Sequence, residues 1–347
     1  MTDALQPTAA RPATLEDVAR VAGVSRSTVS RVVNGVRNVD AALQETVRQA
    51  VAATGYVPNS AARALVTRRA DTVALIVSGA GETGGDGMLF TDPFFGRIVS
   101  GVLGGLRPLG MHPVLMLADD DTSRAQAVGY LRRGSADGAL LVSTHADDPL
   151  PALLAGAGLP AVLFGRPTGP LPLSYVDLAN HDGARLAADH LAGRGCRRVV
   201  TVAGPGSLPA GQDRLAGFRE AMARHGQPWA PAESGDFSQS GGAAAMRRLL
   251  AEHPDLDGVF AANDLMAQGA LAVLRHHGRR VPEDVAVVGF DDSSAATSAH
   301  PRLTTVRQPV EEMAERMTTL LLDRIEQPGE RATSVLFEPR LVVRESA

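Results

Sequence analysis

The chain has 347 residues, of which 44% are apolar and 21% are charged, and its formal net charge is −4. This length and composition are those of a globular protein with two or three compact domains, and they exclude a disordered chain. No stretch of 18 uninterrupted apolar residues is present, so we expect no membrane span.

Cysteine usage and the first residues indicate a compartment. The single cysteine, Cys196, excludes an internal disulfide and a cysteine-based metal site, and it fits a reducing environment. The first residues lack the basic and then apolar pattern of a signal peptide. We therefore predict a cytoplasmic protein without cofactor or metal, whose residues 1–11 form a disordered tail.

The charge is unevenly distributed along the chain. Residues 11–69 carry nine arginines against four carboxylates, a net of +5, whereas residues 70–347 carry about −8. A basic segment on an acidic body is typical of a protein whose one end meets nucleic-acid phosphates. All basic residues are arginines, which looks like a codon bias of the whole chain rather than selection for DNA.

The first predicted domain, residues 12–57, begins with two short helices. Thr14 with Asp17 forms a capping box before an apolar stripe, and Gly23 is placed to end this helix. Ser25 then caps a second helix over residues 26–33. Two short helices joined by a glycine-containing turn predict a helix-turn-helix, whose second helix enters the DNA major groove.

A third helix and a linker follow. Asp40 caps a helix that continues to about residue 53, and residues 58–69 are predicted as a hinge. The segments TLEDVARVAGVSRSTVSRVVNG and GYVPNSAARAL resemble the DNA-binding head and hinge of the LacI/GalR family of transcription regulators. The spacing of the two motifs also fits that family.

The resemblance implies a role for ten residues. Arg26 and Ser27 match the positions that select the half-site sequence, and Arg31 matches an arginine that contacts a base, such as guanine. Residues that match phosphate contacts are Thr28, Ser30, Asn34, Tyr56 and Asn59. Ala62 and Leu65 match hinge residues that enter the minor groove.

The hinge is expected to be helical only on DNA. Pro58 and Asn59 suit a helix start, but so short a helix is unstable alone. Leu65 would wedge into a central base step and kink the duplex; its alternative role is that of a core leucine.

The remainder, residues 70–347, alternates short apolar runs with helical patterns, which predicts buried parallel sheets. The expected strands are residues 73–78, 113–118, 138–143, 160–165, 198–204, 258–263 and 285–290. The fold class is therefore multidomain: an all-α helix-turn-helix head and an α/β core of two doubly wound parallel-sheet lobes. This core resembles the periplasmic-binding-protein-like fold of the same family.

The family's chain crosses three times between its lobes, and we expect crossings near residues 167, 298 and 328. The near lobe, which directly follows the hinge in sequence, would then comprise about residues 70–166 and 299–328. The far lobe would comprise about residues 167–298 and 329–347.

Ligands of open parallel sheets bind beyond the carboxyl ends of strands, where Ser78, Asn263 and Asp291 lie. The family resemblance implies the same residues as effector contacts, together with Arg214, Phe95 and Phe237. Arg214 falls in the first turn of a predicted helix, where a cation opposes the helix dipole. A forked donor, an amide and a carboxylate suit the hydroxyls of a sugar, although a purine remains open.

Several of these residues have a structural alternative. Asp264 or Asn263 would cap the following helix, one of Asp291 and Asp292 would only shape a turn, and Phe237 would belong to the core. Arg214 would be an exposed helix residue. Arg166 is a weaker candidate, and the glycine-rich segment at residues 79–92 departs from the family pattern.

Two other classes of protein, a sugar-transport protein and an enzyme, would require different sequence features. A sugar-transport protein of the same fold would need a signal peptide and no DNA-binding head. An α/β enzyme would need a nucleophile elbow, a phosphate loop or a metal motif, none of which is present in the sequence. We expect a homodimeric regulator, which binds a near-palindromic operator and responds to a small molecule. Repression is favoured over activation, and the effector acts as inducer or corepressor.

Overall fold

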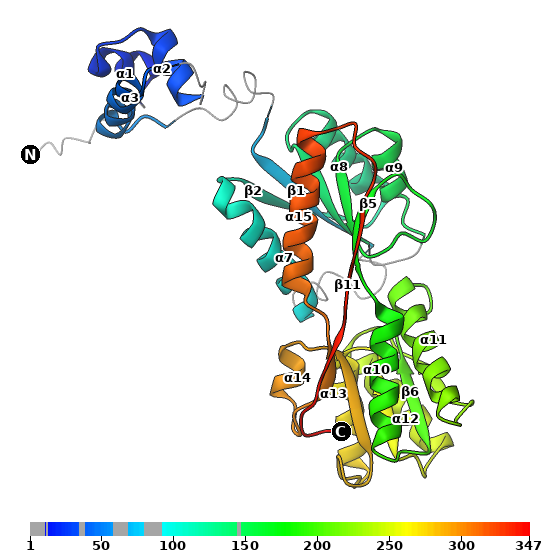
Figure 1. The fold of residues 1–347 in the computed structure, drawn as a ribbon. Coiled ribbons are helices and arrows are strands. Elements are labelled where there is room, and N and C mark those ends of the chain that lie inside the picture. The colour runs from blue at the N-terminus through cyan, green and yellow to red at the C-terminus, as the bar shows by residue number, and fades with distance from the viewer. Residues whose placement is uncertain (1–10, 12, 35–38, 58–68, 80–91, 144–146) are drawn as a thin grey trace, which may run out of the picture. The chain divides into compact units, whose positions relative to one another are not determined.

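The computed structural model describes residues 11, 13–34, 39–57, 69–79, 92–143 and 147–347 (Figure 1). The chain divides into two compact units, Met1–Asp71 and Thr72–Ala347. The predicted tail except Arg11, the hinge residues 58–68 and most of the glycine-rich segment lie outside the described residues.

In the described part of the first unit, the helices are α1 (Leu15–Ala22), α2 (Arg26–Val33) and α3 (Ala41–Thr54). Each begins as predicted, because the side chains of Thr14, Ser25 and Asp40 accept hydrogen bonds from backbone N–H groups of the first turn. Gly23 ends α1 in the left-handed conformation, with φ of 66°. The buried side chains of this small core are Val18, Ala19, Val29, Val47 and Ala50.

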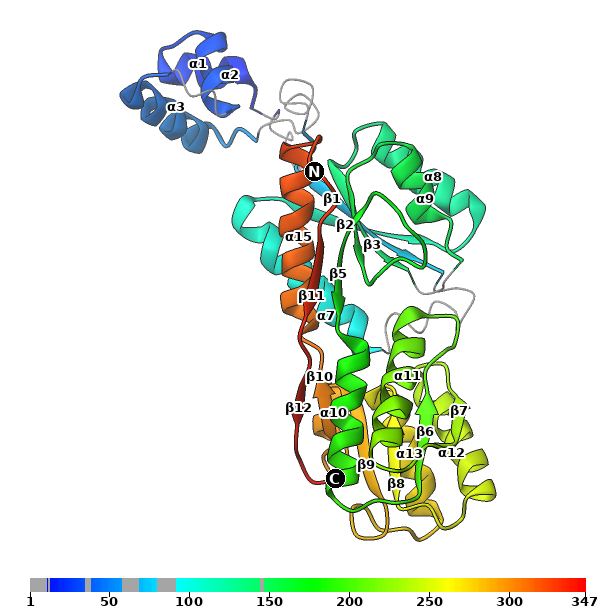
Figure 2. The same ribbon diagram turned by 45° about the vertical axis from the view of Figure 1, so that its right-hand side comes forward.

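The near lobe is built on a six-stranded parallel sheet with the order β11–β5–β4–β3–β1–β2. Its strands are β1 (Thr72–Ser78), β2 (His112–Ala118), β3 (Gly138–Ser143), β4 (Ala161–Phe164), β5 (Ser174–Leu178) and β11 (Ser334–Phe337). Its helices are α7 (Pro93–Leu106), η1 (Arg107–Leu109), α8 (Asp121–Arg132), α9 (Leu150–Gly156) and α15 (Val310–Glu326). Alternate residues of β1 pack toward α7 with α15 and toward α8 with α9, so helices cover both faces (Figure 2).

The far lobe repeats this architecture with the order β12–β10–β9–β8–β6–β7. Its strands are β6 (Val199–Ala203), β7 (Ala232–Ser234), β8 (Gly258–Ala261), β9 (Ala286–Asp291), β10 (Thr304–Arg307) and β12 (Arg340–Val342). Its helices are α10 (Asn180–Gly193), α11 (Pro209–Arg224), α12 (Gln239–Glu252), α13 (Asp264–His276) and α14 (Ser294–Ser298). Only the pairing of β12 with β10 is antiparallel.

The seven expected strands and the two doubly wound lobes are confirmed, but the crossings lie about ten residues later than predicted. Strands β5 and β11 belong to the near-lobe sheet, and β10 belongs to the far-lobe sheet. The chain therefore crosses after Leu178, after Arg307 and after Phe337. The last crossing is visible as the C-terminal segment that runs from one lobe to the other (Figure 1).

These strands were missed for a physical reason. β5, β10 and β11 have only four or five residues, and their sequences, SYVDL, TTVR and SVLF, mix polar and apolar side chains. They therefore lack the continuous apolar run that marks a buried parallel strand. No helix in the described part of the chain is long and apolar enough to cross a membrane.

Candidate functional site

Helix α2 presents a polar face that is suited to DNA. Residues 26, 27, 30, 31 and 34 fall within an arc of about 140° at 100° per residue, while Val29 and Val33 point to the core. Arg26, Ser27 and Arg31 are exposed, and Ser30 and Asn34 are half-buried and hydrogen-bonded to each other at 3.3 Å. This face carries five of the ten predicted DNA contacts.

The other predicted contacts lie elsewhere. Thr28 is on the flank of α2, where its backbone N–H and its hydroxyl both contact the Ser25 hydroxyl. Tyr56 is half-buried and packs against the head core. Asn59, Ala62 and Leu65 lie outside the described residues. The Arg26 guanidinium is 3.1 Å from Glu16, an exposed ion pair that costs little to exchange for a phosphate or base contact.

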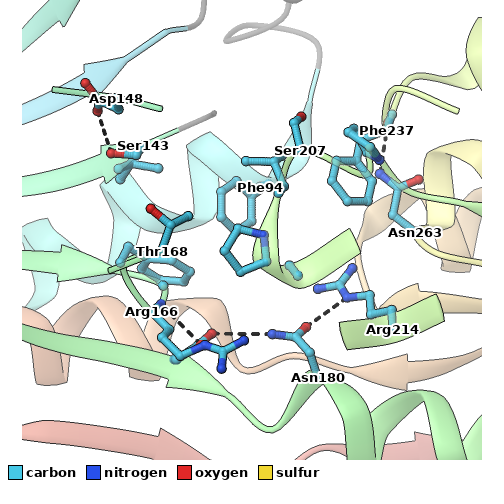
Figure 3. A pocket seen from close by; sticks show the side chains of 18 of the residues that line it. Phe94, Ser143, Asp148, Arg166, Thr168, Asn180, Ser207, Arg214, Phe237 and Asn263 are labelled. Carbon is cyan, nitrogen blue, oxygen red and sulfur yellow. Dashed lines mark hydrogen bonds between the residues drawn. The ribbon is translucent and has the colours of Figure 1, made fainter. Parts of the chain in front are cut away.

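The second unit contains a cavity of about 470 Å³ between the two lobes, a volume typical of small-molecule sites. Five of the six predicted effector residues line it: Phe95 and Asp291, and also Arg214, Phe237 and Asn263, which are labelled in Figure 3. Ser78 is not among the lining residues. It is fully buried, and its hydroxyl contacts the Ala118 carbonyl and the Asp148 carboxylate, each at 2.9 Å.

Arg214 is the most heavily bonded side chain of the cavity. Its Nε donates to Asn180 Oδ1 at 2.8 Å, and Nη1 donates to the Ala262 carbonyl at 2.7 Å and to Asp291 Oδ1 at 3.3 Å. Its Nη2 donates to Gln308 Oε1 at 2.9 Å. Among the described residues, four of the five guanidinium N–H groups thus have acceptors, and one remains for a ligand.

The predicted helix position of Arg214 is wrong, although the residue is at the site. Helix α11 begins at Pro209, so Arg214 lies in its second turn, and the argument from the helix dipole does not apply. Arg214 is also buried, with 4% of its surface exposed, and its guanidinium lies 3.7 Å from the centre of the Phe290 ring. Aromatic stacking and four acceptors together hold this cation in place.

The carboxylate of Asp291 faces Arg214 across the cavity floor. Burial raises the pKa of Asp291 to about 8, although Arg214 and Arg97 favour its ionised form. Asp264, fully buried behind it, accepts hydrogen bonds from Ser293 and Thr305, and burial raises the pKa of Asp264 to about 6. A ligand that changes the hydration of these two carboxyl groups would therefore change their pKa values.

Asn263, not Asp264, caps helix α13. Its Oδ1 accepts from the Met266 backbone N–H at 2.8 Å, and its Nδ2 donates to the Phe237 carbonyl at 2.8 Å. The Asn263 side chain thus joins the start of α13 to the segment that carries Phe237. Gly204 leaves room for the Phe237 ring, because a Cβ at that position would be 2.6 Å from it.

Three residues at or next to the cavity have strained backbone conformations. Phe237 has φ of 65°, Asp291 of 109° and Asp292 of 53°, a region that costs non-glycine residues about 1–3 kcal/mol each. Asp292 ion-pairs with Arg344 at 2.5 Å, so of the two neighbouring aspartates it is the one that shapes the turn. Surrounding contacts must hold Asp291 in this conformation.

The near-lobe wall contains residues that the sequence analysis did not identify. Phe94 packs edge-on against Phe95 and Phe164, with ring centres 5.4 Å apart in each pair. The Ser143 hydroxyl donates to Asp148 Oδ2 at 2.6 Å at the same end of the cavity (Figure 3). An aromatic wall opposite a polar floor suits a ligand with one apolar face and several hydroxyls.

Arg166, the weaker candidate, also lines the cavity. Its Nη2 donates to Asp213 Oδ2 at 2.8 Å, from the near lobe to α11 of the far lobe. Asn180 and Gln308, which bind Arg214, follow two of the three crossings, and no sequence signal marked them. Within the described residues, no group of three or more His, Cys, Asp or Glu side chains is placed to hold a metal ion.

A helix-turn-helix head joined to a two-lobed core with an interlobe cavity defines a class of protein, the ligand-responsive DNA-binding regulators. Two family models match the chain: "Bacterial regulatory proteins, lacI family" over residues 14–59 and "Periplasmic binding protein-like domain" over residues 188–347. The chain is 48% identical to the transcriptional regulator CelR of Thermobifida fusca, over 97% of this chain and 98% of CelR. It therefore belongs to the lacI family of bacterial regulatory proteins, and it is a DNA-binding transcriptional regulator.

Other relatives and solved structures agree. The ribose operon repressor of Escherichia coli K12 is 32% identical over 96% of this chain and all of its own length. A structure described as a CelR–cellobiose complex is 47% identical, with a TM-score of 0.75, and covers 97% of this chain and 100% of that one. The lac repressor dimer bound to operator and an anti-inducer has a TM-score of 0.81 at 28% identity, over 97% and 99% of the two chains.

Proposed function

We propose that this regulator senses a small carbohydrate in the interlobe cavity, and that a glucose disaccharide such as cellobiose is the first candidate. The observation that carries the proposal is the buried floor of Arg214 and Asp291 beneath an aromatic wall. A guanidinium and a carboxylate bind neighbouring hydroxyls together, and aromatic rings cover the apolar face of a sugar. The CelR–cellobiose complex supports the choice of sugar.

The experiment is a thermal-shift series of the full-length protein with cellobiose, maltose, glucose, ribose and hypoxanthine. A ligand that binds only the folded state raises the melting temperature by mass action. We expect the largest shift with cellobiose and none in an Arg214→Ala variant. A shift with hypoxanthine alone would replace the carbohydrate by a purine, the second class considered from the sequence.

We further propose that the protein acts as a homodimeric repressor on a near-palindromic operator in the cytoplasm, rather than as an enzyme. The named repressors among its relatives support repression, and the lac repressor dimer on operator supports the assembly. Two-fold symmetry of the dimer requires two half-sites of opposite orientation. Light scattering of the free protein and nuclease footprinting on DNA selected from a random pool test both statements.

The DNA contacts follow from the polar face of α2. We propose that Arg26 and Ser27 select the half-site sequence and that Arg31 contacts a base edge. The residues proposed to hold phosphates are Thr28, Ser30, Asn34, Tyr56 and Asn59, and Ala62 and Leu65 are proposed to enter the minor groove. Footprints of the single alanine variants distinguish base contacts from phosphate contacts, since only the former change the preferred sequence.

A further inference from the structure

Arg97 on α7 reaches from the near lobe to the far lobe without lining the cavity. Its Nη1 donates to the backbone carbonyl of Asp291 at 3.1 Å, and its Nη2 donates to the backbone carbonyl of Gln308 at 2.9 Å. The same guanidinium holds Glu311 on α15 through two bonds of 2.8 Å. Only 17% of the Arg97 side chain is exposed, so these bonds are sheltered from water.

Two acceptors of Arg97 belong to residues that also bond to Arg214. Asp291 and Gln308 both line the cavity, and their side chains accept from Arg214 at 3.3 and 2.9 Å. Arg97 therefore holds the backbone of two of the three residues whose side chains bond to Arg214, the third being Asn180. Because its own helix belongs to the near lobe, this support depends on how the lobes are docked.

The strained backbone of Asp291 explains why such support is needed. A φ of 109° is unfavourable for aspartate, and the conformation persists only where contacts hold it. The Asp291 carbonyl accepts from two donors, Arg97 and the Gln308 backbone N–H at 3.3 Å. If the Arg97 bond is lost, the peptide can rotate, and the carboxylate attached to it moves with it.

We propose that Arg97 is a positioning residue for ligand binding, which fixes the Asp291 carboxylate in the far lobe from its place in the near lobe. The proposal deepens the carbohydrate-sensing function proposed above and rests on it only for the choice of ligand. It makes the affinity of the cavity depend on lobe docking, because a far lobe that moves away from Arg97 loses the ordered carboxylate.

The charge of Arg97 also gives the proposal a measurable consequence, which is a change in the pKa of Asp291. The charged groups that face Asp291 are Arg214 on α11, Arg97 on α7, Asp264 on α13 and Asp92 at the start of α7. The two arginines lower the pKa of Asp291 and the two aspartates raise it. Removal of the Arg97 charge must therefore raise the pKa of Asp291, whereas a purely structural contact would not change it in this direction.

The test compares full-length wild type with Arg97→Met, Arg97→Lys and the control Arg307→Met. Arg307 forms an exposed pair with Glu312 at 3.0 Å near the same crossing, but it does not line the cavity. The first readout needs no ligand: the pKa of Asp291 from the ¹³C NMR titration of its carboxyl carbon. The second is cellobiose affinity by calorimetry between pH 6 and 9.

We expect the pKa of Asp291 to rise in Arg97→Met, to return toward its wild-type value in Arg97→Lys and to stay unchanged in Arg307→Met. Cellobiose affinity should fall about tenfold or more in Arg97→Met, the order expected for lost hydrogen bonds from a charged donor. Lysine restores the positive charge but not the planar set of guanidinium donors, so affinity in Arg97→Lys should recover only in part.

Glu311→Gln provides a folded comparison in case Arg97→Met is unstable. It weakens the ion pair within the near lobe and leaves the bonds to the Asp291 and Gln308 carbonyls in place, so affinity should remain close to wild type. A wild-type pKa of Asp291 in a folded Arg97→Met variant would overturn the positioning role. If wild type ignores cellobiose while Arg97→Met still shifts the pKa, the proposed ligand is wrong and the positioning role stands.

Discussion

Arg214 and Asp291 are the two side chains on which the proposed ligand binding of the core mainly depends. Arg214 is buried and Asp291 is largely so; Arg214 donates to Asp291 and also to Asn180, Gln308 and the Ala262 carbonyl. A buried pair of this kind contributes little net stability, but the loss of one partner leaves an uncompensated charge. A ligand that bonds to both groups would therefore change how the charges of Arg214 and Asp291 are compensated.

Replacement of Arg214 by alanine should therefore affect folding as well as ligand binding. Above pH 8, where Asp291 is ionised, we expect the free energy of unfolding to fall by about 3–5 kcal/mol, the usual cost of breaking a buried pair. Urea unfolding followed by circular dichroism measures it. As a control, Arg185→Ala removes an exposed pair on α10 and should change stability by less than about 1 kcal/mol. A loss in Arg214→Ala no larger than in the control would contradict the buried-pair account.

The raised pKa of Asp291 gives a pH dependence with a definite sign. Since the pKa is about 8 in the folded protein and about 3.9 in an unfolded chain, the folded state holds an extra proton between these values. Asp291 therefore lowers stability as pH rises from about 4 to 8, by at most about 1.4 kcal/mol per pH unit. The Asp291→Asn variant lacks this contribution. Its stability relative to wild type should rise with pH, and a difference independent of pH would exclude the raised pKa.

On the DNA-binding head, Arg31 is exposed on the polar face of α2. We expect Arg31→Ala to lose about 1–3 kcal/mol of discrimination between specific and random DNA, because a bidentate base contact is removed. Fluorescence anisotropy with both DNAs measures the difference. Arg48→Ala, on α3, serves as the control. Equal losses on both DNAs would reduce Arg31 to a phosphate contact.

The limits of sequence reasoning are clearest for single residues. Asn263 and Asp291 could be predicted because each follows an expected strand whose apolar run is plain, whereas Arg214 was found through the family resemblance, since its expected helix position was wrong. Asn180 and Gln308 could not, since they lie beside strands that the pattern did not reveal. Ser78 shows the reverse error: a position at a strand end does not tell whether the side chain faces the cavity or, as here, Ala118 and Asp148.

At the scale of elements, the packing of α7 against α15 sets the position of Arg97. Gly101 permits close approach, because a Cβ there would be 2.3 Å from the Glu311 carbonyl oxygen and 2.7 Å from the Ala314 Cβ. Arg97, one turn earlier on α7, can then reach Glu311 and the far lobe. The contact between two helices thus supports a residue of the ligand site.

Two glycine substitutions on α7 should have opposite effects. Gly101→Ala forces α7 and α15 apart and should cost about 1–3 kcal/mol, as overpacking does. At Gly96 a Cβ meets nothing within 4 Å, so Gly96→Ala should stabilise the protein by about 0.4–1 kcal/mol through lower chain entropy. Thermal or urea unfolding of both variants measures these changes. A neutral Gly101→Ala would contradict the close packing of the two helices.

The strands differ in how well the apolar pattern of the sequence predicts them. Long apolar runs such as residues 73–78 and 138–143 predicted their strands closely, because burial on both faces leaves a strong signal. The strands next to a crossing, β5, β10 and β11, are short and partly polar. Their membership of one sheet or the other is decided by pairing with strands distant in sequence, which no local pattern records.

At the scale of the whole core, two of the three crossings and the cavity form one connected network. Asp177 in β5 accepts from Asn180, and Asn180 accepts from Arg214 (Figure 3); Arg214 also donates to Gln308 beyond β10. Any change in the lobe angle must therefore move groups that contact the ligand. Ligand and operator are coupled if they favour different lobe arrangements, and the coupling acts equally in both directions.

The most direct test of the central claim is a coupled titration of the full-length protein with operator DNA and cellobiose. Operator affinity, measured by fluorescence anisotropy with DNA selected from a random pool, should change by a constant factor at saturating cellobiose. Operator should change cellobiose affinity by the same factor, and Arg214→Ala should lose the response. An operator affinity that is unchanged by cellobiose, in a protein that calorimetry shows to be saturated with it, would contradict the account.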